Sequence, residues 1–245
     1  MDNSEILKSF ETQKELNPKI WDKKGKKYVM DSQVREKLLE ITNLFIDFLG
    51  VDILVTDIIM IGSLTNYNWS KFSDIDLHIV VNYSQFPENT KDLYVEFFDL
   101  KKIIFNQKHN LKMFGYDVEC FVQDENEVTF SSGVYSVLYD MWVNEPKKEN
   151  MKDIDKDLIK EKAKQWMRII DGVVDNIKDE TPDEIKTIVK TYKEKLKKFR
   201  NCGLQKGGEM SLENLVFKLL RRNGYIEKLY NLPTEIIDKK LSMNQ

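Results

Sequence analysis

The stretch that decides the fold is residues 58–82, IIMIGSLTNYNWSKFSDIDLHIVVN. Its first four residues are apolar and predict a buried strand, after which Gly62-Ser63 requires a tight turn of the backbone. A polar loop follows, and a second largely apolar run predicts another strand that begins at Asp74. Successive side chains of a strand point to opposite faces, so Asp74 and Asp76 share one face of this strand.

The two aspartates indicate a metal site. Carboxylates that lie side by side repel each other, and half-burying them on an apolar strand adds a desolvation cost. A divalent cation between them removes that cost, and their hard oxygen atoms suit Mg²⁺. The glycine turn that precedes them can bring backbone N–H groups close to a phosphate. The residues themselves therefore predict a magnesium ion facing a phosphate.

The same order of features resembles a known family. An apolar strand, Gly62-Ser63, a loop of about ten residues and Asp-x-Asp inside a second strand resemble the nucleotidyltransferase fold of the DNA polymerase β superfamily. Over residues 15–145 the chain is similar to predicted nucleotidyltransferases of large tailed bacteriophages. The resemblance implies a fold and a reaction class, and it leaves the acceptor open.

The resemblance also implies the catalytic groups. Members of the superfamily hold two Mg²⁺ ions, for which Mn²⁺ is an alternative, so Asp74 and Asp76 need a third carboxylate from a neighbouring strand. Glu119 matches this role and is expected to be catalytic and metal-binding together with the two aspartates. Asp117 has the same facing, so the third position stays open between them. Glu119 is favoured because it lies deeper in its apolar run.

A second group of residues is expected to contact the nucleotide. Gly62 and Ser63 would form the phosphate-binding turn, and Ser73 matches the Ser-Asp-x-Asp variant of the motif. Lys71 lies in the loop between the strands. The expected substrate is an NTP, with ATP favoured. His78 shares the face of the aspartates, and a hydrogen-bonded structural role is favoured for it over a catalytic one.

Composition narrows the class of protein. The chain has 245 residues and is 41% hydrophobic, which is enough for a packed core. Its formal net charge of −3 means that it has no global basic field to attract nucleic acid. The two cysteines are far apart in the sequence, which favours free thiols over a disulfide or a zinc site. Charged residues interrupt every long apolar run, so we expect no membrane contact and a cytoplasmic location, in the host cytoplasm if the protein is viral.

The predicted order of elements is α+β: a small mixed β-sheet nucleotidyltransferase core flanked by helices over residues 1–145, then a helical domain over 146–245. In the first part we expect helices at 4–16, 31–49 and 90–108, a charged loop at 23–27, and strands at 116–123 and 128–130. From residue 133 onward we expect helices at 133–143, 151–177, 182–199, 211–223 and 233–241.

Two of these helices have details that a structure can check. Asp31 or Ser32 is expected to begin the helix over 31–49, and Gly50 is expected to end it. In the helix over 90–108, apolar residues recur at helical spacing and are expected to face the core; they are Leu93, Phe97, Leu100 and Ile104.

The leading functional hypothesis is Mg²⁺-dependent transfer of an NMP from an NTP to a hydroxyl, with release of pyrophosphate. The acceptor could be an RNA 3′ end, a protein, a small molecule or a second nucleotide. Basic residues gather over 186–206, where they could contact RNA, although a solvated helix face gives the same pattern. One alternative is an NTP-binding regulator without turnover. Another is a helical interaction module on an inert sheet, which predicts no nucleotide binding.

Overall fold

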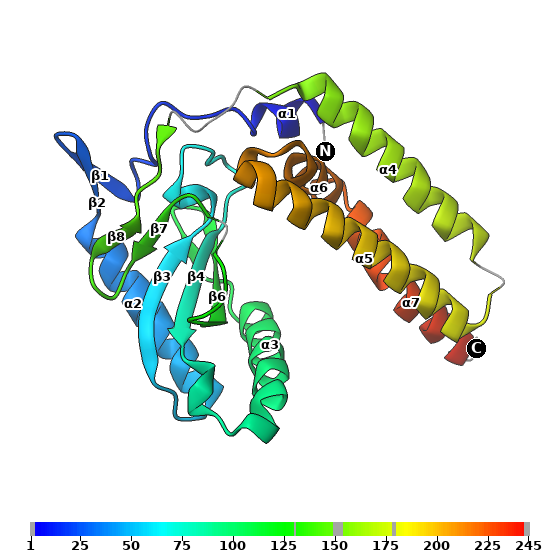
Figure 1. The fold of residues 1–245 in the computed structure, drawn as a ribbon, viewed down its shortest axis with the longest axis horizontal. Coiled ribbons are helices and arrows are strands. Elements are labelled where there is room, and N and C mark those ends of the chain that lie inside the picture. Colours follow the sequence, from blue (N-terminus) through cyan, green and yellow to red (C-terminus); the bar gives the residue numbers. More distant parts are fainter. Residues whose placement is uncertain (1–2, 130, 149–153, 178–179, 243–245) are drawn as a thin grey trace. The chain divides into compact units, whose positions relative to one another are not determined.

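The computed structural model divides the chain into two compact units (Figure 1). A sheet unit comprises residues 11–151, and a helical unit comprises residues 1–10 and 152–245. Within these units the structure describes residues 3–129, 131–148, 154–177 and 180–242. Each unit has an apolar core of its own.

The sheet unit contains one mixed six-stranded sheet, which agrees with the α+β class expected from the sequence. Its strands lie in the order β5-β6-β4-β3-β7-β8; β4 and β6 are parallel, and every other neighbouring pair is antiparallel. The strands are β3 (Val55–Ile61), β4 (Ile75–Val81), β5 (Lys112–Met113), β6 (Tyr116–Asp124), β7 (Val134–Ser136) and β8 (Met141–Asn144).

Two helices cover one face of this sheet, α2 (Ser32–Leu49) and α3 (Lys91–Lys108) (Figure 1). Alternate side chains of the strands, such as Leu77 and Cys120, lie in the core with residues of both helices. The Phe45 and Phe105 rings meet there at 4.9 Å. On the opposite face, the apolar cluster of the described residues contains only strand side chains; they are Ile59, Ile61, Val80 and Val134.

The ends of α2 follow from its sequence. The Asp31 side chain accepts hydrogen bonds from the backbone N–H groups of Gln33 and Val34, at 2.9 and 3.0 Å. At the other end Gly50 adopts the left-handed conformation, with φ at 71°. Both features confirm the predicted start and stop of this helix.

Replacing Asp31 with Ala should lower the free energy of unfolding by about 1 kcal/mol, because two N–H groups at the helix start lose their acceptor. Asp31→Asn keeps an acceptor oxygen and is the matched control, expected to lose less than half as much. Urea titration of the three proteins measures the difference. An equal loss in both variants would show that charge, and not capping, accounts for the effect.

Two segments near the sheet differ from the prediction. Residues 23–27 belong to an antiparallel hairpin of β1 (Trp21–Lys24) and β2 (Lys27–Met30), whose turn is made by Gly25 with φ at 68°. Residues 133–143 form β7 and β8 instead of a helix, with Asp140 at φ 55° in the turn between them. Aromatic packing favours the strands, because Trp142 stacks on Trp21 with ring centroids 4.5 Å apart.

Other predicted details are also corrected. Residues 128 and 129 are not in a strand, and residue 130 lies outside the described residues. In α3 the predicted inward positions Leu93, Leu100 and Ile104 are 65%, 60% and 41% exposed, whereas Phe98 and Phe105 are buried. The exposed residues and the two buried phenylalanines each recur at helical spacing, but only Phe98 and Phe105 face the core.

The helical unit contains five α-helices among its described residues: α1 (Asn3–Lys8), α4 (Lys156–Asn176), α5 (Pro182–Gly207), α6 (Leu212–Arg222) and α7 (Tyr225–Leu241). Four of them match predicted helices, but α5 continues past residue 199. Pro233 lies inside α7 and not in its first turn, because α7 begins directly after Gly224. Within the described part of the chain, no helix has the length and apolar character needed to cross a bilayer.

The place of α1 differs from the expected division at residues 145 and 146. Ile6, Leu7 and Phe10 are buried in the core of the helical unit, although they come first in the chain. The Arg222 guanidinium donates a hydrogen bond to Ser9 Oγ. The helix is also shorter than predicted, since it ends at Lys8.

Candidate functional site

Two carboxylates lie side by side on the face of the sheet opposite α2 and α3. β4 and β6 are adjacent and parallel, and their register pairs Asp76 with Glu119. Both side chains are half-buried, while their chain neighbours Ile75, Leu77 and Cys120 are buried in the core on the other side. Strand alternation therefore places both acids on one face.

Asp117, the alternative third carboxylate, is placed differently. It pairs across the sheet with Lys112 of β5 and forms an ion pair with that lysine. Its side chain is exposed. The structure thus brings Glu119, and not Asp117, beside Asp76.

Gly62 makes close contact with this acid pair. The residue follows β3, whose last residue, Ile61, pairs with Asp76. Its backbone angles, φ 90° and ψ −161°, lie in a region that essentially only glycine adopts. A Cβ atom at this position would lie 2.4 Å from Asp76 Oδ2. The missing side chain of Gly62 therefore provides the space that the Asp76 carboxylate occupies.

The two ends of the intervening loop are joined by serines. Ser63 begins the short helix η1 (Ser63–Thr65), and its Oγ lies 2.7 Å from Ser73 Oγ. Ser73 Oγ also accepts a hydrogen bond from the backbone N–H of Ser70 at 3.0 Å. Ser73 directly precedes Asp74, so this hydroxyl pair holds the glycine turn next to the start of the Asp-x-Asp strand.

A segment that the sequence analysis overlooked, Ser131–Gly133, supports the glycine turn. Ser131 Oγ accepts a hydrogen bond from the Gly62 N–H at 3.2 Å, and Thr65 Oγ1 lies 2.8 Å from the carbonyl oxygens of both Gly62 and Gly133. A Cβ atom at Gly133 would lie 2.0 Å from the Thr65 carbonyl oxygen. The N–H of Gly62 is therefore hydrogen-bonded within the protein, to the hydroxyl of Ser131. In the sequence, only the small residues Ser131-Ser132-Gly133 could have indicated this close contact with the glycine turn.

Asp74 and Lys71, the remaining predicted site residues, lie outside the paired strands. Asp74 is half-buried and lies one residue before β4. Lys71 is exposed, with its Nζ 5.0 Å from the centroid of the Phe72 ring. Among the described residues, no three His, Cys, Asp or Glu side chains already converge in a geometry that could hold a metal ion.

His78 has the hydrogen-bonded arrangement expected of a structural histidine. Its Nδ1 lies 2.7 Å from Gln123 Oε1, and its ring stacks on Phe121 with centroids 4.6 Å apart. Burial lowers the pKa of His78 to about 4, so the imidazole is neutral at pH 7. A neutral ring adds no positive charge to the neighbouring carboxylates.

The two cysteines are free thiols, as the sequence predicts. Cys120 is fully buried in the core of the sheet unit, on the face opposite the acid pair. Burial raises the pKa of its thiol to about 12, which suits an inert core residue.

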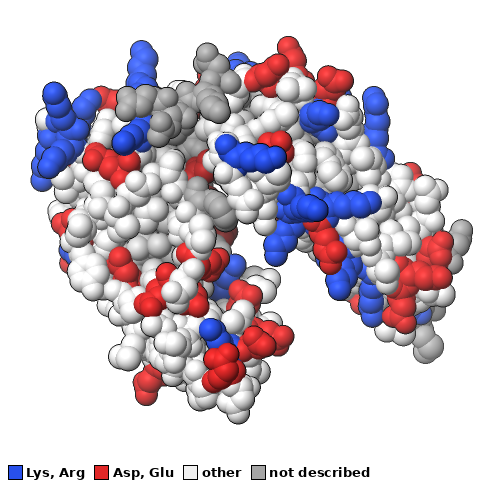
Figure 2. Space-filling model, in the orientation of Figure 1, with Lys and Arg blue, Asp and Glu red and all other residues white. Residues whose placement is uncertain are grey.

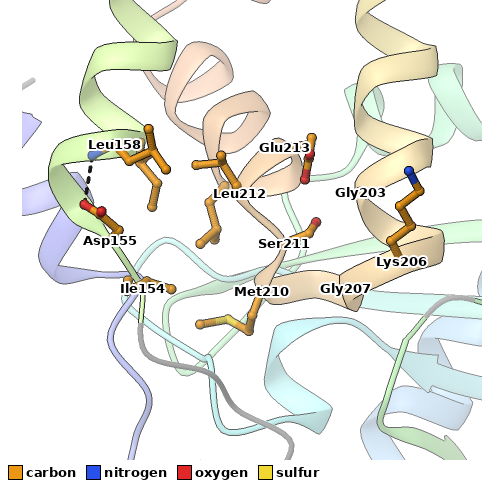
Figure 3. A pocket seen from close by; sticks show the side chains of 12 residues that line it. Ile154, Asp155, Leu158, Gly203, Lys206, Gly207, Met210, Ser211, Leu212 and Glu213 are labelled. Atoms are coloured by element: carbon orange, nitrogen blue, oxygen red, sulfur yellow. Dashed lines mark hydrogen bonds between the residues drawn. The ribbon is translucent and has the colours of Figure 1, made fainter.

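The helical unit offers two further features. A hollow of about 300 Å³ lies between the start of α4, the end of α5 and the start of α6, with Lys206, Ser211 and Glu213 among its lining side chains (Figure 3). It contains none of the predicted site residues. Lysines also follow one side of α5 at helical spacing, and Figure 2 shows basic side chains along this helix; they are Lys186, Lys190, Lys193 and Lys197.

No protein-family model matches the chain, and neither the curated proteins nor the solved structures that were searched include a match.

Proposed function

We propose that the protein is a Mg²⁺-dependent nucleotidyltransferase with the core fold of the DNA polymerase β superfamily. One observation carries the proposal: Asp76 and Glu119 are paired in register on adjacent parallel strands, against a glycine whose missing side chain makes room for Asp76. A merely solvated strand face does not require this close approach of backbone to carboxylate. The helices α2 and α3 cover the opposite face of the sheet.

The donor set suits magnesium. Mg²⁺ is usually bound by one or two protein carboxylates together with waters and substrate phosphates, and it does not require a complete protein cage. Asp76 and Glu119 supply two carboxylates, and Asp74 supplies a third from the same strand. When bound, the metal would neutralise charge on the phosphates and activate the attacking oxygen.

The protein residues then have separate roles. The hydroxyls of Ser63 and Ser73 would donate hydrogen bonds to the β- and γ-phosphates, in place of their contact with each other. Glu119 would take the proton of the acceptor hydroxyl. The acceptor oxygen forms a bond to the α-phosphorus, and the bond to pyrophosphate breaks. Lys71, which is exposed in the loop, would approach the nucleotide.

For the acceptor, we favour an RNA 3′ end. Lys186, Lys190 and Lys197 are exposed along α5 and could lie along a phosphate backbone, whereas the Nζ of Lys193 contacts Tyr230 of α7. Such binding should weaken steeply with salt. ATP is the favoured donor nucleotide.

A second candidate is an NTP-binding protein without turnover. It is motivated by the lack, among the described residues, of three preassembled metal-ligating groups. Losing one ligand can preserve triphosphate binding and remove catalysis. Calorimetry with Mg²⁺-ATP separates the candidates: binding without product, unchanged in Glu119→Gln, favours this reading, and detectable turnover excludes it.

The test of the leading proposal is transfer of label from each NTP to RNA, protein or small-molecule acceptors with Mg²⁺. Glu119→Gln should lower the transfer rate on the order of 10²–10³-fold, because its amide can neither take the proton nor carry the charge that the metal needs. Asp117→Asn is the matched control and should stay within about threefold of the wild type, since Asp117 pairs with Lys112 on the edge strand. No transfer from any NTP by the folded protein would contradict the proposal.

A further inference from the structure

The outward face of α3 carries an apolar stripe of which three residues are exposed, while the fourth packs partly against the core of the sheet unit. Its residues are spaced four, three and four apart, which is the seam pattern of a coiled coil; they are Leu93, Phe97, Leu100 and Ile104. Phe97 is half-buried, and the other three are exposed. Exposed apolar side chains are ordinary when scattered, but a continuous seam on one helix indicates a partner helix.

Charges flank the stripe in a complementary way. In the heptad set by the seam, Glu96 occupies a g position on one side, and Lys101 occupies an e position on the other. Glu96 is exposed on the helix surface. Lys101 is half-buried, with its Nζ 4.8 Å from the centroid of the Phe48 ring and 2.9 Å from the Phe48 carbonyl oxygen.

A parallel pair of such helices brings g of one helix against e of the next heptad on the other, five residues later. Glu96 would therefore meet Lys101 of a second chain, and by symmetry this contact would occur twice. An antiparallel pair would instead set g against g, and Glu96 would face the apolar g residue Ile103. The charge pattern thus fits the parallel arrangement.

The next g–e contact is apolar in the same arrangement. Ile103 is exposed at the following g position. In a parallel pair it would meet Lys108, at an e position of the second chain. The Nζ of Lys108 lies 5.7 Å from the centroid of the Phe48 ring. Ile103 would pack on the methylene stem of Lys108 and on that ring. Both g–e contacts, the charged one and the apolar one, are therefore compatible with packing against a second copy of this chain.

We infer that the protein forms a parallel two-fold dimer in which α3 packs against α3 of a second copy of this chain. The interface is separate from the acid pair, because α3 covers the opposite face of the sheet. It does not depend on any catalytic role. A seam of this length belongs among small, weak interfaces, with a Kd on the order of 1–100 μM.

Sedimentation equilibrium of the full chain tests the association. The wild type should show a monomer–dimer equilibrium, and Leu100→Lys should raise the dimer Kd by about tenfold or more, since it places a charge in the seam. Leu241→Lys, at an exposed apolar position of α7, is the matched control and should leave the Kd unchanged. A monomer at every concentration up to about 500 μM would overturn the inference. So would a dimer that Leu100→Lys leaves intact.

Charge exchange and cross-linking test the orientation. Glu96→Lys and Lys101→Glu should each weaken self-association about tenfold, because like charges then meet at g and e; mixing the two variants should restore dimers as mixed pairs. Thermal unfolding shows that each variant is folded. In a Cys202→Ser background, Leu93→Cys should form a disulfide with itself on oxidation. Failure to rescue by mixing, or cross-linking only when Ile104→Cys is added, would overturn the parallel arrangement.

Discussion

Replacing Asp74 and Asp76 together with asparagine is expected to abolish Mg²⁺-dependent nucleotide binding while leaving the free protein as stable as before, or slightly more stable. Asp76 faces Glu119 across paired strands, so two negative charges lie close together without a metal. An amide removes this repulsion and fits the same space. Amide oxygens lack the charge that holds Mg²⁺, so ligand binding is lost.

Thermal unfolding with and without Mg²⁺-ATP measures both effects. Ligand at a hundred times its Kd stabilises the wild type by about 2.7 kcal/mol, and this gain should vanish in the double variant. Asp47→Asn with Asp52→Asn is the matched control, because it removes the same charge from exposed positions of the sheet unit. A ligand-induced shift that survives in the Asp74/Asp76 variant would place the metal site elsewhere. A loss of stability without ligand would assign the aspartates a structural role.

Gly62→Ala should disable the site even though it adds a single methyl group. The backbone angles of Gly62 cost a non-glycine residue about 1–3 kcal/mol. The new methyl group would also lie 2.4 Å from Asp76 Oδ2, so the carboxylate must move. Displacing a reacting group by about 1 Å can cost on the order of 10²-fold in rate. We therefore expect a large loss of transfer together with a lower melting temperature.

Gly115→Ala separates strain from close approach. Gly115 has nearly the same φ, 88°, in the turn between β5 and β6, but nothing lies within 4 Å of an added Cβ. It should lose about 1–2 kcal/mol of stability and keep its transfer rate. Equal rate losses in the two variants, measured below both melting temperatures, would mean that Gly62 acts through global stability alone.

Local signals predicted part of this structure. Asp31 and Gly50 act over a few residues of backbone, so the limits of α2 could be predicted from the sequence. Strand alternation likewise predicted that Glu119 lies opposite the core face that Cys120 occupies. The register that pairs Glu119 with Asp76 is set by the packing of the sheet, and no spacing in the sequence specifies it.

Competing local patterns explain what could not be predicted. In α3, Leu93 and Leu100 recur at helical spacing, and so do Phe98 and Phe105; only the tertiary packing selects the aromatic pair for the core. Residues 133–143 carry aromatic residues that suit a helix or a strand, and stacking of Trp142 on a distant ring decides for strands. Ser131 was missed for the same reason, since its contact with the Gly62 N–H spans 69 residues.

The position of α1 has a consequence for synthesis on the ribosome. The sheet unit is one continuous segment, residues 11–151, inserted between two pieces of the helical unit. It can complete its core while the later residues are still being translated. Ile6, Leu7 and Phe10 leave the ribosome before the sheet unit, but their partners on α6 emerge some 200 residues after them. Until then the apolar side of α1 stays exposed on the nascent chain, where a chaperone could bind it.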